Sequence, residues 1–259
     1  MAFTTSSLEL LRAALPFWYV RYYRYYRGLR LGSYLIGDLA PIILYVWLFS
    51  GHVNWSLVLL AWLLFWSFYE IGYLENDVKS VARESLPSIR LPESVHRAYA
   101  FIVVVRLAQF LMLAAAMLSL DSSVNGWLLA SYVAVTAITF KVHNGLKQYQ
   151  GRLVTLVGLG VLKPIFVPGV LGLDVAGLVC VMVPSLIVKL FDYASKKGFA
   201  DHPLRENFRA RLLMHLGFVP PLALIDFRLL IVLSPILLAV ALVPVVRYLT
   251  NRRPSGGMS

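Results

Sequence analysis

Long apolar runs recur along the whole chain and limit the folds that are open to it. Of its 259 residues, 59% are hydrophobic and 14% are charged, whereas a soluble domain typically carries about 25% charged residues. Several of the runs approach the roughly 20 residues that an α-helix needs to cross a bilayer. The sequence therefore predicts an all-α polytopic membrane protein.

About eight membrane-spanning helices are predicted. Their approximate ranges are 33–50, 54–74, 98–119, 125–141, 153–172, 174–191, 211–225 and 229–248. The seventh run is short and contains Pro220 and Pro221, which a span tolerates where neighbouring helices satisfy the freed backbone groups. We expect a single transmembrane domain over residues 1–250, followed by a disordered polar tail at 251–259.

The basic residues are distributed as membrane topology requires. All but three of the 24 lysines and arginines fall on one side of the predicted spans; Arg228 lies on the other side, and Arg106 and Lys163 lie inside spans. An excess of basic residues marks the cytoplasmic side. We therefore expect an integral protein of the cytoplasmic or inner membrane, with both termini in the cytoplasm. The net charge of +11 follows from this topology, which argues against nucleic acid as a partner.

The first 32 residues are predicted to lie on the membrane surface. Leu8, Leu11, Leu15 and Trp18 recur at helical spacing, and arginines alternate with tyrosines over residues 19–30. Aromatic rings and long cationic side chains both suit the headgroup layer. An interfacial helix that anchors the chain explains this pattern, and the alternative is that some of its arginines bind a phosphate.

The predicted spans form two halves of four helices, 33–141 and 151–248. In each half the second span ends in an acidic residue before a long basic loop, Asp77 in the first half and Asp192 in the second. This matching placement predicts a degenerate internal repeat with both halves in the same orientation.

Acidic side chains gather at the cytoplasmic end of the second span. Glu70, Tyr73 and Asp77 have a spacing of i, i+3 and i+7, which places them on one face of a helix. Asn76 and Asp77 offer hard oxygen ligands, and Mg²⁺ commonly takes one or two carboxylates together with substrate phosphates. Ionisable residues at membrane depth indicate function by default. The alternative is that Glu70 and Asp77 are helix-end charges paired with nearby basic residues.

Basic residues around these acids suit an anionic substrate. Lys79, Arg83 and Arg90 follow in the sequence and are expected to bind phosphate oxygens that a metal leaves uncovered. Zinc is not expected, because neighbouring His or Cys ligands are missing from the stretch. Farther away, Asp38 lies just inside the first span. It is a candidate ion-pair partner for Arg106 or Lys163, or a residue that reaches the cleft in which the substrate would bind.

The stretch Asn76-Asp77-Val78-Lys79-Ser80-Val81-Ala82-Arg83-Glu84 resembles the N-D-x-x-D-x-x-x-D motif of UbiA-type intramembrane prenyltransferases. In that family the motif follows the second span, and a second Asp-rich motif follows the sixth. The predicted topology matches both placements. Asn76 and Asp77 match the motif, whereas Ser80 replaces its second aspartate and Glu84 its third. Of the second motif, Asp192 is retained.

The resemblance implies a set of site residues. Asn76 and Asp77 would be catalytic. Mg²⁺ would be held by Asn76, Asp77, Glu84 and Asp192. The phosphates would be bound by Lys79, Arg83, Arg90, Lys147, Arg152 and Lys196. Glu70, Tyr73 and Tyr193 are expected to line the cleft.

The expected reaction is the Mg²⁺-dependent transfer of a prenyl group from a polyprenyl diphosphate to an acceptor within the membrane, through ionisation of the allylic diphosphate. The expected partners are the isoprenoid (di)phosphate lipid and an acceptor that the sequence does not identify. One alternative is a polyprenyl-phosphate-binding relative that acts on a phosphosugar donor or serves as a non-catalytic membrane subunit. A transporter or flippase would suit two similar halves, but the acids lie at the cytoplasmic mouth rather than in mid-membrane.

Overall fold

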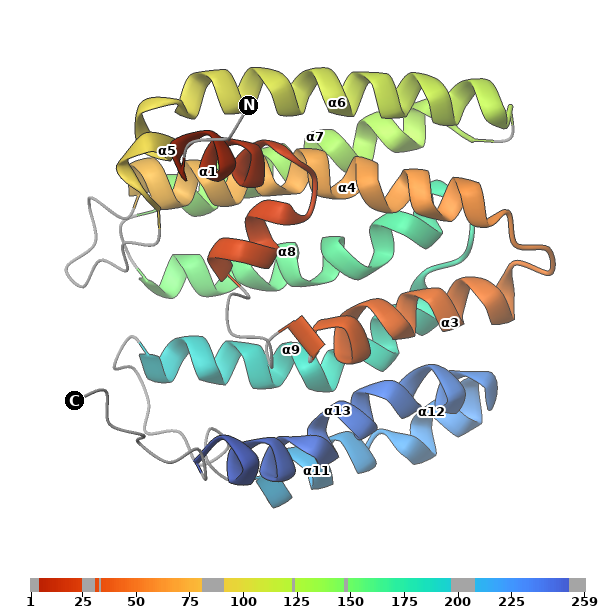
Figure 1. Cartoon of the computed structure of the whole chain (residues 1–259). Coiled ribbons are helices and arrows are strands. Elements are labelled where there is room, and N and C mark those ends of the chain that lie inside the picture. The colour runs from red at the N-terminus through yellow and green to blue at the C-terminus, as the bar shows by residue number, and fades with distance from the viewer. Residues whose placement is uncertain are drawn as a thin grey trace. The chain divides into compact units, whose positions relative to one another are not determined.

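Helices form all the regular structure in the described part of the chain. The computed structural model describes residues 5–24, 31–32, 34–80, 91–122, 124–146, 149–196 and 208–251, and no strand occurs among them (Figure 1). The elements are, in order, α1 (Thr5–Ala14), the π-helices η1 (Val20–Arg24) and η2 (Leu35–Leu39), α3 (Ala40–Phe49), α4 (Trp55–Glu75), the π-helix η3 (Asn76–Ser80), α5 (Glu93–Arg97), α6 (Tyr99–Leu120), α7 (Gly126–Gly145), α8 (Tyr149–Val170), α9 (Ala176–Lys196), α11 (Phe208–Leu216), α12 (Val219–Ile225) and α13 (Arg228–Asn251). The prediction of an all-α protein is confirmed.

Five helical stretches of the described chain are long and apolar enough to cross a membrane. They are Trp55–Lys79, Tyr99–Leu120, Gln150–Val170, Ala176–Ser195 and Phe208–Ile225, and two shorter apolar stretches are Leu35–Phe49 and Arg228–Leu242. These helices fit an integral membrane protein. Large apolar side chains such as Phe101, Leu111 and Met112 are exposed along α6, as expected for a surface that faces lipid. The number of eight spans and the cytoplasmic placement of the termini stay predictions.

Two predicted spans take a form that the apolar pattern did not indicate. The run at 125–141 is the helix α7, but Lys141, His143 and Asn144 make its end polar, and α7 is not among the five stretches. The run at 211–225 is broken after Leu216 into α11 and α12, and prolines occupy the first turn of α12. Proline lacks the backbone N–H that a continuous helix would use, so it fits a first turn best.

The chain divides into two compact units. The first contains Met1–Arg27 and Ser50–Asp174, and the second contains Gly28–Phe49 and Val175–Ser259. These units do not coincide with the halves of the predicted repeat, because α3 belongs to the second unit and α8 to the first. The repeat itself stays a prediction.

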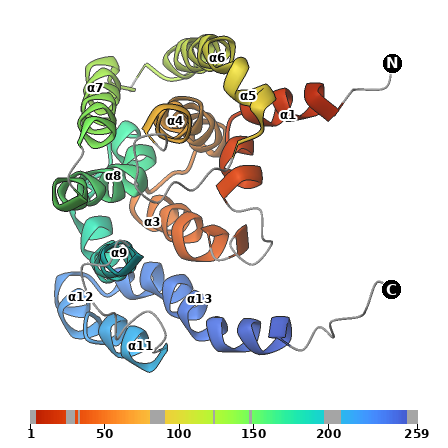
Figure 2. The ribbon, with the colours of Figure 1, turned by 90° about the vertical axis from the view of Figure 1, so that its left-hand side faces the viewer.

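In the first unit α4 is the central helix. It contacts α6, α7 and α8, which surround it in Figure 2, and α1 packs on α5 and α6. The side chains of Ala61, Leu64 and Leu74 on α4 are fully buried. The helix begins at Asn54, whose side-chain oxygen accepts hydrogen bonds from the N–H groups of Ser56 and Leu57. Such a cap satisfies donors that have no partner within the helix.

Near its C-terminal end, α4 approaches α7 closely. A Cβ atom at Gly72 would overlap the ring of Phe140, so glycine is the residue that fits here. The side chain of Asn144 on α7 also donates a hydrogen bond of 3.2 Å to the carbonyl of Gly72. These two contacts set the position of the last turns of α4, which lead directly into η3.

In the second unit α13 is the central helix. It contacts η2, α3, α9, α11 and α12 and buries Leu229, Leu233 and Ile236, which share one helix face. At its start Arg228 donates to Asp226 and to the carbonyl of Leu48, and its guanidinium lies over the ring of Phe49 at 4.2 Å. The turn between α12 and α13 is thereby joined to the end of α3.

Candidate functional site

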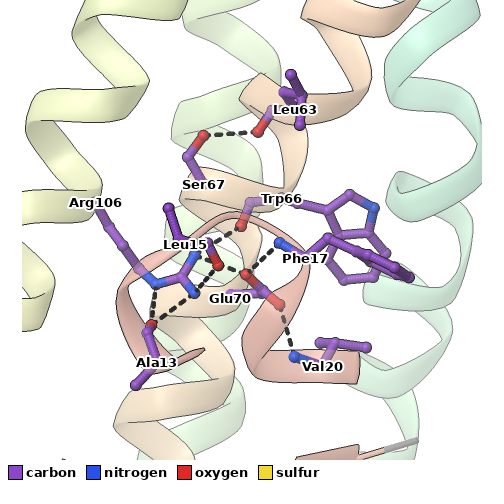
Figure 3. Close-up of polar contacts among 9 residues, drawn as sticks. All are labelled: Ala13, Leu15, Phe17, Val20, Leu63, Trp66, Ser67, Glu70 and Arg106. Atoms are coloured by element: carbon purple, nitrogen blue, oxygen red, sulfur yellow. Dashed lines mark hydrogen bonds and ion pairs between the residues drawn. The ribbon is translucent and has the colours of Figure 1, made fainter. Parts of the chain in front are cut away.

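A buried ion pair lies between α4 and α6 in the first unit. Arg106 Nη1 is 2.6 Å from Glu70 Oε2, and neither side chain has exposed surface (Figure 3). Burying two charges costs free energy unless their remaining donors and acceptors are satisfied. The partners that satisfy them show what this pair holds in place.

Both charged groups bind the backbone of residues 13–20. Arg106 donates to the carbonyls of Ala13 and Leu15 at 2.8–2.9 Å and to that of Trp66 on α4 at 3.4 Å. Glu70 accepts from the N–H groups of Phe17 at 2.9 Å and Val20 at 2.7 Å. The pair therefore binds the N-terminal segment to the first unit (Figure 3).

The bound segment has an irregular backbone that the ion pair compensates. Phe17 has a φ of +68°, and a left-handed conformation of a bulky residue costs about 1–3 kcal/mol. The N–H of Phe17 is bound by Glu70, and its ring packs on Trp62 and Trp66 with centroid distances of 4.9 and 5.5 Å. These contacts offset the strain and turn the chain so that Tyr19 points inward.

Tyr19 brings the same segment to Asp77. The Tyr19 hydroxyl is 2.5 Å from Asp77 Oδ2, Asn76 Nδ2 is 3.3 Å from Asp77 Oδ1, and the side chain of Asp77 is 3% exposed. Glu70 and Asp77 thus contact one segment, in keeping with the helix face that their spacing predicts. Tyr73 instead packs against the rings of Tyr69 and Phe140.

The side chain of Asn76 has one unusual atom. Its Oδ1 is buried and accepts no hydrogen bond within the described residues, although its Nδ2 donates to Asp77. A buried acceptor without a partner costs roughly 1–3 kcal/mol and therefore needs an explanation. A bound ligand that this oxygen coordinates would remove that cost.

Two of the predicted phosphate-binding residues have described contacts. Lys79 Nζ lies 3.4 Å from Glu75 Oε1 and 5.0 Å from the ring centre of Tyr99, and about half of its side chain is exposed. Arg152 is buried, and its Nε donates to the carbonyl of Leu146 at 2.8 Å. Lys79 can reach a ligand in solvent, whereas the Nε of Arg152 is engaged by the residue that follows α7.

The other predicted site residues are distributed over both units or lie outside the described residues. In the second unit Asp192 Oδ1 is 3.0 Å from Arg211 Nη2, Tyr193 is half-buried on α9, and Lys196 is the last residue of α9. Asp38 accepts from Lys189 at 2.8 Å in this unit, while Arg106 pairs with Glu70. Arg83, Glu84, Arg90 and Lys147 lie outside the described residues.

The donor set at η3 suits a hard cation. Asp77 and Asn76 supply a carboxylate and an amide oxygen from adjacent residues, and substrate phosphates and water complete the shell of Mg²⁺ in many sites. Among the described residues, no group of three or more His, Cys, Asp or Glu side chains is arranged to hold a metal ion. Asn76 and Asp77 therefore offer two oxygen donors, and a Mg²⁺ held by them would need phosphate or water oxygens to complete its shell.

Sequence reasoning missed Tyr19 and the pairing of Glu70 with Arg106. Glu70 was predicted to line a cleft, and the structure shows it fully buried with its carboxylate engaged. A signal was present, because an acid and an arginine inside neighbouring spans usually pair with each other.

Comparisons of the chain with protein-family models, with curated proteins and with solved structures find no match. The chemistry of the residues around Asp77 therefore has to indicate what the site does.

Proposed function

We propose that the chain is a membrane enzyme that binds the (di)phosphate of an isoprenoid lipid at Asn76 and Asp77 with Mg²⁺, and transfers the prenyl group to an acceptor in the membrane. The observation that supports this proposal is the buried Oδ1 of Asn76, which has no hydrogen-bond partner in the part of the chain that the structure describes, beside the carboxylate of Asp77. Both oxygens are of the type that Mg²⁺ prefers. They lie where an apolar span ends, which is where the phosphate of a membrane lipid would be.

Each residue has a defined task in this proposal. Asn76 and Asp77 would hold the cation, and Tyr19 orients Asp77 through its hydrogen bond of 2.5 Å. Lys79 is exposed enough to bind phosphate oxygens. When bound, Mg²⁺ would stabilise the negative charge that develops on the leaving diphosphate. Tyr73, one turn before Asp77 and partly exposed, offers a ring face to an allylic cation.

One observation favours a second candidate, a non-catalytic subunit that binds a lipid phosphate. The Tyr19 hydroxyl already occupies one carboxylate oxygen of Asp77, and the segment that carries it is bound by the Glu70–Arg106 pair. A segment held this firmly would restrict the exchange of substrate and product. It would still allow a lipid phosphate to bind and remain bound without turnover.

The test uses the full chain purified in detergent. The protein is given Mg²⁺ and prenyl diphosphates of several lengths, together with aromatic and lipid-phosphate acceptors, and released diphosphate is measured. We expect release with at least one donor, and its loss in Asp77→Asn and Asn76→Ala. Glu93→Gln is the matched control, because Glu93 is an exposed acid on α5 that pairs with Arg97 and is assigned no task at the site.

The outcomes separate the candidates. If no donor reacts but polyprenyl phosphate binds in a Mg²⁺-dependent way that Asp77→Asn abolishes, the protein is the non-catalytic binder. If neither reaction nor Mg²⁺-dependent binding occurs, the proposed site is wrong. A transporter would instead move an unchanged lipid across sealed vesicles.

A further inference from the structure

Two arginines of the N-terminal segment share one tyrosine ring. Arg12 Cζ on α1 lies 4.3 Å from the ring centre of Tyr22 in η1, and Arg21 Cζ lies 5.5 Å from the same centre. The ring of Trp18 is 5.3 Å from that of Tyr22. Cation–π contacts of this kind hold guanidinium groups in place while leaving their N–H donors available.

Neither guanidinium makes an ion pair within the described residues. Arg12 Nε is moreover buried without a hydrogen-bond partner in that part of the chain. The nearest acid in the sequence, Glu9, accepts a hydrogen bond of 2.6 Å from Ser94 Oγ instead. An arginine fork of this kind matches the oxygens of a phosphate group. The two guanidinium groups, held beside one ring, therefore offer positive charge to an anionic ligand.

Tyr23, which lies near Arg12, does not carry a negative charge that would balance the two arginines. The pKa of its hydroxyl is raised to about 12, mainly by burial and also by the charge of Glu9, while the charge of Arg12 acts in the opposite direction. The hydroxyl is therefore neutral at physiological pH, and it donates to the carbonyl of Glu9 at 3.3 Å. Tyr23 therefore adds no negative charge beside Arg12.

Apolar side chains lie exposed beside these arginines. Leu11 is 45% exposed and Trp18 is 42% exposed, whereas Ala13, Tyr19 and Val20 of the same segment are buried in the first unit. Apolar and aromatic groups next to arginine are typical of a surface that lies in the headgroup layer. Because its inner face is bound to the first unit, the segment presents this outer surface in one orientation.

We propose that Arg12 and Arg21 bind the phosphate of an anionic membrane lipid, with Trp18 and Leu11 inserted beside it among the headgroups. The site fixes residues 5–24 on the membrane surface. It uses none of the residues around Asp77 and does not depend on the function proposed for them. Positive charge favours an anionic lipid over a zwitterionic one.

The experiment compares lipids bound to the purified full chain by native mass spectrometry. The protein in detergent is titrated with phosphatidylglycerol or phosphatidylcholine, and the occupancy of the tightest site is fitted. Each basic residue near an anionic surface contributes about fivefold, so the double variant Arg12→Ala/Arg21→Ala should bind phosphatidylglycerol roughly 25-fold more weakly. Arg12→Lys/Arg21→Lys keeps the charge but loses the planar guanidinium groups. Its affinity for phosphatidylglycerol should lie between those of the unmodified protein and the double alanine variant.

Arg97→Ala is the matched control, because Arg97 is an exposed cation on α5 whose partner is Glu93. It should bind phosphatidylglycerol like the unmodified protein. If the double variant does not purify as folded protein, Arg21→Ala, which keeps the partly buried Arg12 in place, gives the same comparison with a smaller loss.

Three outcomes would overturn the proposal. One is equal affinity for both lipids, and another is unchanged phosphatidylglycerol binding in the variants. The third concerns the source of the phosphate. If millimolar inorganic phosphate displaces phosphatidylglycerol from the unmodified protein, and the double variant also loses phosphate binding, the site binds free phosphate rather than a lipid.

Discussion

Glu70 and Arg106 form an ion pair of 2.6 Å without exposed surface, and every described bond that either side chain makes outside the pair goes to backbone. A buried ion pair often contributes little net stability compared with apolar residues of the same size. This pair has a structural task that apolar residues could not perform. It satisfies N–H and carbonyl groups of an irregular segment that would otherwise be buried without partners.

Arg106→Met should destabilise the protein by about 3–5 kcal/mol, because it leaves Glu70 as an uncompensated buried charge. It also removes the donors to the carbonyls of Ala13 and Leu15. The free energy of unfolding in detergent measures the loss. Limited proteolysis should in addition show faster cleavage between residues 14 and 24, where the segment is released.

Exchanging the charges tests the reason for this loss. Glu70→Arg/Arg106→Glu restores an opposite pair, but position 70 then carries no acceptor for the N–H groups of Phe17 and Val20. We therefore expect no rescue. Arg97→Ala, which breaks an exposed pair with Glu93, should cost less than about 0.5 kcal/mol. Full rescue by the exchange would show that the Coulomb attraction alone matters.

Gly72→Ala should destabilise the first unit, because the added Cβ overlaps the ring of Phe140 on α7. Overpacking of this kind typically costs about 1–3 kcal/mol. Gly158→Ala on α8 is the control, because its Cβ would meet Thr139 Cγ2 at an ordinary 3.4 Å. Adding Phe140→Leu should recover part of the stability lost in Gly72→Ala, and a cost that is the same with and without this second change would contradict the explanation.

The sequence predicts the positions of the helices better than it predicts the contacts between residues that are far apart in the chain. Apolar runs locate α4, α6, α8 and α9, because helix formation and membrane insertion depend on nearby residues. The contact of Tyr19 with Asp77 joins positions 58 residues apart, and no local pattern indicates it. The prediction of Asp77 as a key acid rests on its place at the end of a span, which local sequence does show. The strained turn at Phe17 depends on the Glu70–Arg106 pair, so it follows only from the fold.

Acid should weaken the turn between α12 and α13. Hydrogen bonds from Arg228 lower the pKa of Asp226 below its usual 3.8, so the native state favours the ionised form. A lowered pKa contributes stability above the unfolded-state value and loses it as the pH falls through the native value. The difference in melting temperature between the protein and Asp226→Asn should be constant from pH 7 to about 5 and shrink below about pH 4. A difference that does not change over this range would contradict the assignment.

Tyr19→Phe tests whether the hydroxyl positions Asp77 for a cation. The ring stays in place in this variant, so only one buried hydrogen bond is lost, which should cost about 1 kcal/mol of stability. Partners that orient a metal-binding carboxylate typically affect metal affinity by about 10–100-fold, so Mg²⁺-dependent binding of polyprenyl phosphate should weaken by that factor. Tyr22→Phe is the control, because the Tyr22 ring contacts Arg12 and not Asp77. If Tyr19→Phe loses stability and keeps its Mg²⁺ dependence, the bond to Asp77 is structural. If lipid binding becomes tighter, the Tyr19 hydroxyl competes with the lipid for Asp77, and the N-terminal segment restricts exchange at the site as described for the non-catalytic candidate.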